Sequence, residues 1–108
     1  MKMSVEELNE ICMEMIANAA EGRAKVYEAL ESYHKKEWDS ALTSLDEAQE
    51  HLAEAHKIQF ERLMSPQSGG TEIPFSMLLL HAMDMAMAAT SEHDMLRSFV
   101  MAGKEREA

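Results

Sequence analysis

The chain is poor in the residues that cross-link or interrupt a fold. Among 108 residues there are one cysteine, two prolines, four glycines and one tryptophan. A single thiol, Cys12, cannot form a disulfide within the chain, and this fits a reducing compartment. Cys12 stands among apolar residues at helical spacing, which predicts a small core residue. Turn formers gather in Ser65-Pro66-Gln67-Ser68-Gly69-Gly70, which predicts the one clear loop.

Positive charge is also scarce. The chain has 20 acidic and 10 basic residues and a formal net charge of −10. This balance argues against nucleic acid or an anionic membrane surface as the main partner. The N-terminus turns acidic at Glu6 and Glu7, where a signal peptide would have an apolar core. The apolar run 75–89 is shorter than the roughly 20 residues that span a bilayer. We therefore expect a soluble, cytoplasmic protein without stable membrane insertion.

Hydrophobic residues recur at steps of three and four along most of the chain, which is the helical period, and strand signals are almost absent. The pattern predicts a single helical domain, 1–108, with helices over about 4–33, 38–64 and 74–102 and a flexible tail at 103–108. Three rods of this length with short connections favour an all-α fold, an up-down-up antiparallel three-helix bundle.

Local signals support the expected helix ends and contacts. Ser4 and Glu7 can form a capping box, in which each side chain satisfies the backbone N–H of the other residue. Pro74 suits the first turn of the third helix. Gly22 lies inside the first helical pattern and indicates close approach to another helix. The eleven methionines of the chain are suited to filling gaps in a core or an interface.

The segment 74–89 is apolar on every side apart from Ser76, His81 and Asp84. Such a helix must be covered all round by protein, whereas a three-helix bundle hides only about half of each helix. The uncovered strip would be large enough to mark an interface, so we expect self-association. The alternative is a flexible, methionine-rich surface that binds varied partners. The strip would contain several of Met77, Leu80, Met83, Met87 and Ala88.

Several motifs stand in an order that is known from one protein family. They are Ala17-Asn18-Ala19-Ala20-Glu21-Gly22-Arg23-Ala24-Lys25, Ala55-His56-Lys57-Ile58-Gln59, a glycine-containing loop, Pro74-Phe75-Ser76, and Leu79-Leu80-His81-Ala82-Met83-Asp84. In these motifs the chain resembles the enzyme IIA component of the lactose/cellobiose (N,N'-diacetylchitobiose) group of the bacterial phosphoenolpyruvate-dependent sugar phosphotransferase system. The resemblance spans nearly the whole chain.

The resemblance implies a three-helix subunit that forms a homotrimer with a nine-helix core. It implies that His81 accepts a phosphoryl group from the histidine-containing phosphocarrier protein and passes it to a cysteine of a IIB component. The family's axial aspartate matches Asp84, which would bind a divalent cation, with Mg²⁺ as the expected metal, together with its symmetry mates. The resemblance therefore implies a phosphohistidine carrier in sugar uptake.

The chemistry of the residues agrees with these roles. A neutral imidazole nitrogen can attack a phosphoryl group and form a reactive phosphoramidate. Transfer then depends on positioning and on hydrogen-bond donors around the phosphate. His56 and Gln59, on the second predicted helix, are candidates to line that site. Three copies of Asp84 at one axis would repel one another, so a bound cation or shared protons would be needed.

Two positions depart from the family pattern. After the active histidine the family has Ala or Gly, then Gln, Asp and His, whereas this chain has Met83 in place of the Gln and Met85 in place of the second His. Each change swaps a hydrogen-bonding side chain for a weak acceptor. An alternative hypothesis is therefore a non-transferring regulatory or structural paralogue that keeps the trimeric bundle. A third is a generic helical interaction module without a phosphotransferase link.

The remaining histidines, His34, His51 and His93, are expected to be solvated. The segment Glu31-Ser32-Tyr33-His34 matches one half of a di-iron motif. Such sites need two of these motifs on separate helices and two further carboxylates. Since only one is present, we interpret it as a chance match.

Overall fold

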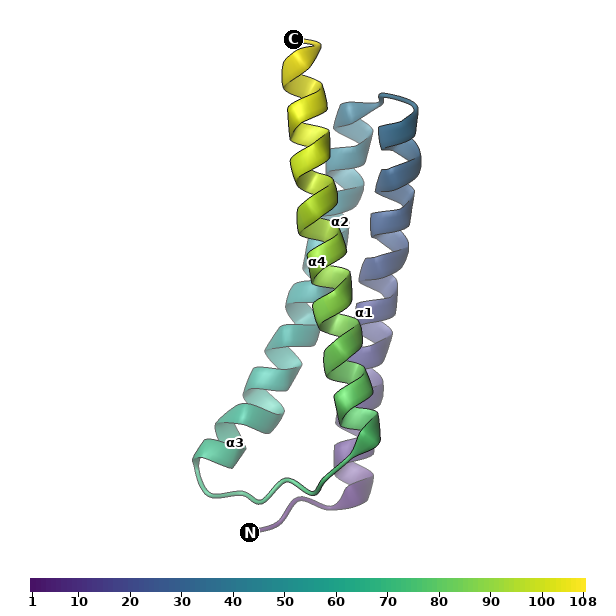
Figure 1. Ribbon diagram of the computed structural model, residues 1–108. Coiled ribbons are helices and arrows are strands. Elements are labelled where there is room, and N and C mark those ends of the chain that lie inside the picture. The colour runs from purple at the N-terminus through teal and green to yellow at the C-terminus, as the bar shows by residue number, and fades with distance from the viewer.

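The structure is a computed structural model that describes residues 1–108. Three long helices run side by side in up-down-up order (Figure 1). These are α1 (Val5–His34), α2 (Trp38–Gln59) and α4 (Met77–Arg106), and α2 is extended by a π-helical turn, η1 (Phe60–Met64), and by the short helix α3 (Ser65–Ser68). No β-strand element is present. The predicted all-α three-helix fold is confirmed.

Serine hydroxyls cap the first turns of α1 and α4. The Ser4 hydroxyl accepts a hydrogen bond from the Glu7 N–H at 3.0 Å, which is one half of the predicted capping box. The Ser76 hydroxyl accepts one from the Leu79 N–H at 3.1 Å. Each bond satisfies a backbone donor that the helix itself leaves free. The third helix therefore does not begin at Pro74 as expected, because the extended backbone of Ser76 forms the cap.

The segment before α4 pairs with the N-terminus of the chain. The Met3 N–H donates to the Glu72 carbonyl at 3.0 Å, and the Glu72 N–H donates to the Met1 carbonyl at 2.8 Å. Met3 is buried in the hydrophobic cluster at this end of the bundle. These bonds hold the loop that leads from α3 to α4 (Figure 1).

The far end of α4 extends to Arg106, beyond the predicted end at about residue 102, so most of the segment 103–108 is helical. The helix continues to Arg106 because its last turns are fastened to the start of α2. The Trp38 indole lies over Gly103 and donates a hydrogen bond to Glu107 Oε2 at 3.1 Å. Lys104 Nζ lies 2.7 Å from Asp39 Oδ1. These contacts join α4 to residues of α2, so the sequence of α4 alone could not predict where the helix ends.

The core narrows in the middle of the bundle. Two larger hydrophobic clusters fill its ends, and between them Ala19, Ala55 and Ala86 form a small cluster. A Cβ atom added to Gly22 would come within 2.7 Å of Leu52 Cδ2. The close helix approach predicted from this glycine is therefore confirmed. Small side chains let the three helices approach each other here.

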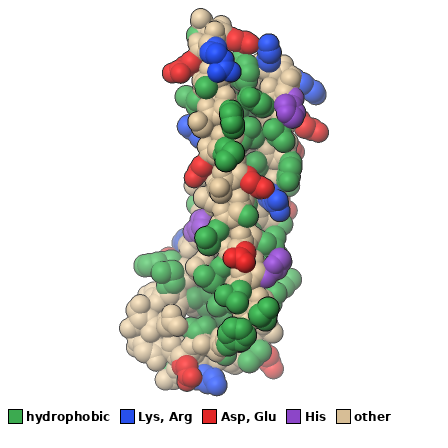
Figure 2. All heavy atoms as spheres, viewed as in Figure 1, with side chains coloured by type: hydrophobic (Ala, Val, Ile, Leu, Met, Phe, Trp, Pro, Cys, Tyr) green, Lys and Arg blue, Asp and Glu red, His purple; other side chains and the backbone are tan.

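One side of α4 remains uncovered. We define the outer face of α4 as Met77, Leu80, Asp84, Met87, Ser91 and Met95, all of which are exposed. Met77, Met87 and Met95 are 71%, 63% and 62% exposed. In Figure 2, which is viewed with α4 in front, hydrophobic side chains gather along this helix. The single chain thus leaves an apolar strip bare, as the sequence predicts.

Candidate functional site

His81 lies on α4 with its side chain exposed and without a hydrogen bond to the rest of the chain. Glu92 and Phe99 follow it by 11 and 18 residues, so at about 100° per residue they share its angular position. Glu92 accepts hydrogen bonds from the Arg23 guanidinium of α1 at 2.9 and 3.0 Å. Phe99 lines an apolar groove with Tyr27 of α1. His81 therefore lies on the flank of α4 that borders α1, which we call the α1 flank.

Gln59 lies on the other side of α4. It is half-buried and lines a pocket of about 130 Å³ with Leu79 and Met83. Met83 is two residues from His81 and so roughly 200° around the helix. We call this side of α4, which borders α2 and η1, the α2 flank. Leu79 and Met83 lie two residues before and after His81, so the pocket has nearly the same height along the bundle as His81.

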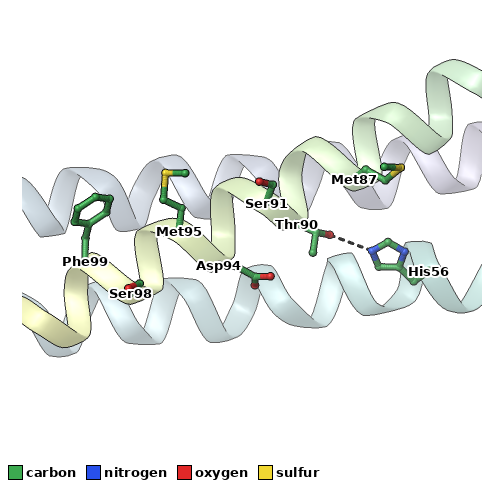
Figure 3. A pocket seen from close by; sticks show the side chains of 8 residues that line it. All are labelled: His56, Met87, Thr90, Ser91, Asp94, Met95, Ser98 and Phe99. Carbon is green, nitrogen blue, oxygen red and sulfur yellow. Dashed lines mark hydrogen bonds between the residues drawn. The ribbon is translucent and has the colours of Figure 1, made fainter.

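His56 also lies on the α2 flank, but further along the bundle. Its Nε2 is 3.0 Å from the Thr90 hydroxyl (Figure 3). That hydroxyl in turn donates to the Ala86 carbonyl at 2.8 Å. Since the Thr90 proton is used on that carbonyl, His56 must donate from Nε2, and in the neutral ring Nδ1 then carries the lone pair. Thr90 follows His81 by nine residues, so it is about 180° around α4 and about 14 Å along it.

A shallow groove of about 710 Å³ begins at His56 and follows α4. Figure 3 shows Asp94 and Ser98 on successive turns of α4 beyond Thr90, with Met95 and Phe99 beside them. Neither Thr90 nor Asp94 belongs to the site residues that the sequence predicts. Thr90 could have been found only by noticing that it shares the angular position of Met83 on the predicted helix.

One chain does not bring the predicted site residues together. His81 occupies the α1 flank, while Gln59 and His56 occupy the α2 flank at two different heights. Asp84 is exposed on the outer face between the two flanks. A site that combines His81 with Gln59 would therefore require a second copy of the chain.

The two methionines that depart from the family pattern both pack inward. Met83 lies against the hydrophobic cluster that contains Ala82, and Met85 lies against the alanine cluster in the middle of the bundle. Both are half-buried. Their side chains therefore contribute to packing and present no strong hydrogen-bond donor near His81.

The expectation that all three remaining histidines are solvated is wrong for His93. This side chain is buried at 5% exposure, and its Nε2–H donates to the Leu45 carbonyl of α2 at 3.0 Å. Its Nδ1 lies 2.9 Å from Asp94 Oδ1. His93 therefore ties α4 to α2 from inside the bundle. His34 is exposed and His51 is half-buried.

A family model described as "PTS system, Lactose/Cellobiose specific IIA subunit" matches residues 10–104, which is most of the chain. The chain belongs to the lactose/cellobiose-specific IIA family of the sugar phosphotransferase system. The resemblance inferred from the motifs is thereby confirmed, and this IIA component is a sugar-specific part of that system. None of its helices is long and apolar enough to cross a membrane.

Related proteins agree with this assignment. This IIA component is 30% identical over 98 residues to the lactose-specific EIIA component of Staphylococcus epidermidis, covering 91% of this chain and 93% of that protein. It is 30% identical over 95 residues to the lichenan-specific phosphotransferase enzyme IIA component of Bacillus subtilis, covering 88% and 86% of the two chains.

Solved structures show the same fold. PtcA from S. mutans superposes with a TM-score of 0.90 at 29% identity, covering 94% of this chain and 99% of that one. The cellobiose-specific enzyme IIA from Bacillus anthracis superposes with a TM-score of 0.81 at 28% identity, covering 97% and 94% of the two chains. The bundle is therefore the fold of the family.

The metal expected from the family requires more ligands than one chain offers. No group of three His, Cys, Asp or Glu side chains lies close enough together to hold an ion. Asp84 is a lone carboxylate on an apolar, exposed face. Carboxylate oxygens are the ligands that Mg²⁺ prefers, so Asp84 fits such a site only where several copies of it meet.

Proposed function

We propose that this IIA component is a phosphoryl carrier. His81 accepts a phosphoryl group from the histidine-containing phosphocarrier protein and passes it to a cysteine of a IIB component. The observation that carries this proposal is an exposed imidazole, free of intrachain hydrogen bonds, at the position to which the motif resemblance assigns the active histidine. An unpaired ring nitrogen is available as a nucleophile toward phosphorus.

The proposal includes a homotrimer. The outer face of α4 is long, apolar and bare, and an exposed strip of this kind marks an interface. Copies arranged around a threefold axis, with α4 inside, would cover it and give nine helices in all. In such a ring each copy presents its α1 flank to the α2 flank of the next copy. His81 of one subunit then approaches Gln59 of its neighbour, because both lie at similar heights.

The same arrangement would bring three copies of Asp84 to the axis. Asp84 is the one charged residue of the outer face, so the apolar residues around it would enclose the three carboxylates. Burying like charges together is costly unless a cation compensates for them. The three Asp84 side chains would hold a divalent cation, for which Mg²⁺ is our expectation. The ion would hold the trimer together, and no step of the transfer depends on it.

His56 has a different place in this arrangement from the one that the sequence suggested. While neutral, it offers a lone pair from Nδ1, and an acceptor does not stabilise phosphoryl oxygens. It also lies about 14 Å along α4 from His81. We therefore assign the phosphate-lining role to Gln59 and place His56 in the groove that the neighbouring subunit would cover.

Phosphorylation in vitro tests the carrier function. The protein is incubated with phosphoenolpyruvate and the general phosphotransferase components, and an acid-labile phosphate is expected on His81. His81→Ala should abolish the label. His34→Ala, which removes an exposed imidazole elsewhere, should keep it. An unlabelled wild type, under conditions that label a standard IIA component, would contradict the assignment.

The alternative function is a regulatory or structural paralogue that does not transfer phosphate. The observation in its favour is that Met83 and Met85 pack inward and offer no donor near His81. Restoring the family residues with Met83→Gln and Met85→His separates the two functions. The carrier proposal expects label on the wild type as well as on the restored variant, whereas the alternative expects label on the restored variant alone.

A further inference from the structure

The pocket beside Met83 is lined by two side-chain amides. The family pattern has a single glutamine at the position of Met83. The pocket is lined by Gln59 of α2, Gln67 of α3 and Met83 of α4, together with apolar neighbours. Gln59 is half-buried and Gln67 is exposed. Neither side-chain amide bonds to another group of the chain, and no buried polar atom lacks a partner. Both amides therefore keep free N–H donors.

The π-helical turn η1 explains why Gln67 lies beside Gln59. In a regular α-helix a residue eight positions on is rotated by about 80°. A π-turn contains an extra residue and so offsets this rotation. Leu63 and Met64 line the same pocket on the turns between the two glutamines. The local change in helix type thus aligns the two amides along one edge, where the end of α2 leans away from α4 (Figure 1).

The height of the pocket matches that of His81. Leu79 and Met83, which form its α4 wall, lie two residues before and after His81, within about 3 Å along the helix. The pocket is on the α2 flank and His81 is on the α1 flank. In a cyclic assembly, equal heights on opposite flanks meet. The pocket of one subunit would then open toward His81 of the next.

We propose that Gln59 and Gln67 together replace the donor that is lost at Met83 and bind the phosphoryl oxygens carried by His81 of the neighbouring subunit. This inference rests on the proposed carrier function. In the transfer, the N–P bond of the donor phosphohistidine breaks as a ring nitrogen of His81 forms a new N–P bond. The amides exchange no proton and act only as donors to the phosphoryl oxygens.

The test uses Gln67→Leu, Gln59→Leu, the double variant, and the double variant with Met83→Gln. Leucine keeps the approximate size of glutamine and removes the amide. Gln49→Leu is the matched control, since Gln49 is an exposed glutamine of α2 outside the pocket. The initial rate of labelling of His81 is measured, with sedimentation to verify the assembly. The side-chain amide signals of both glutamines are also followed by NMR before and after phosphorylation.

Each single variant should be labelled roughly tenfold more slowly, the effect of one hydrogen bond to a charged group. Gln49→Leu should be labelled at the wild-type rate, and adding Met83→Gln to the double variant should restore its rate of labelling. The NMR signals of the two side-chain amides should shift on phosphorylation. Wild-type rates in Gln67→Leu, or an unshifted Gln67 signal in labelled protein, would overturn the inference and leave the carrier function standing. An unlabelled wild type would remove the carrier function itself.

Discussion

At the scale of single residues, Thr90 sets the tautomer of His56. Its hydroxyl donates to the Ala86 carbonyl and so can only accept from His56 Nε2. Thr90→Val keeps the shape of the side chain and removes the hydroxyl. We expect nitrogen NMR at mildly alkaline pH to show His56 as the Nε2–H form in the wild type and as a mixture in Thr90→Val. Thr90→Ser should keep the wild-type form, and an Nδ1–H form in the wild type would contradict the assignment.

The single thiol makes stability depend on pH on the alkaline side. Burial raises the pKa of Cys12 in the folded chain, while the unfolded chain has the ordinary value of about 8.5. Above that value the unfolded state loses the proton first, so the free energy of unfolding falls as pH rises. Each unit of difference corresponds to about 1.4 kcal/mol.

Chemical denaturation of the wild type and of Cys12→Ala between about pH 7 and pH 10 measures this contribution. Cys12→Ala should be less stable at neutral pH, because it leaves a small cavity, and should lose less stability toward alkaline pH. Parallel curves for the two proteins would show that the thiol has no part in the dependence.

The environment of a residue could be predicted where it follows from the pattern of its own helix. It could not be predicted where it depends on contacts with another helix. The exposure of His81 and Asp84 follows from their place in an apolar helix that a three-helix bundle cannot cover. The His56–Thr90 bond and the burial of His93 depend on how α2 and α4 are aligned along each other. The spacing of apolar residues in one helix gives no information about how two helices are aligned. The sequence therefore predicted, wrongly, that His93 is solvated.

At the scale of elements, the contact that fastens the end of α4 to the start of α2 depends on a glycine. We call the packing of the Trp38 indole over Gly103 the clamp. A Cβ atom on Gly103 would come within 2.5 Å of the Trp38 ring. We expect Gly103→Ala to displace the indole and to destabilise the protein by about 1–3 kcal/mol, the usual cost of overpacking. In Gly69→Ala the nearest atom would be at 3.5 Å, so this control should be neutral. Thermal unfolding measures both, and an unchanged Gly103→Ala would refute the clamp.

Helix ends could be predicted only where the signal was local. The Ser4 cap of α1 was readable because the hydroxyl and the N–H that it binds lie three residues apart. The end of α4 was not, because Trp38 and Asp39 hold it from 69 and 65 residues away along the chain, respectively. The same holds for the start of α4, where the paired residues Met3 and Glu72 keep the preceding segment extended.

At the scale of the whole molecule, assembly should depend on the outer face of α4. Met87→Lys would place an unpaired charge in the proposed interface, which is costly once water is excluded. We expect this variant to sediment as a single chain with unchanged helix content. Met13→Lys is the control, since Met13 is an exposed methionine on α1, 55% accessible. Equal masses for the two variants would show that the outer face is not the interface.

The proposed cation predicts a response to metal removal. If three Asp84 carboxylates share an ion, a chelator should lower the midpoint of thermal dissociation of the wild-type trimer, and added Mg²⁺ should restore it. Asp84→Asn has no like charges to compensate and should not respond to either treatment. If the chelator leaves the dissociation midpoint of the wild type unchanged as well, there is no metal at the axis.

The abundance of methionine on the outer face has a chemical consequence. Peroxide converts a thioether to a sulfoxide, which is polar and no longer packs as an apolar chain. Met77, Met87 and Met95 are all more than half exposed in the single chain, so each copy would be vulnerable before it joins others and protected afterwards. Oxidative stress would then act on newly made subunits, and methionine sulfoxide reductases would return them to a state that can assemble.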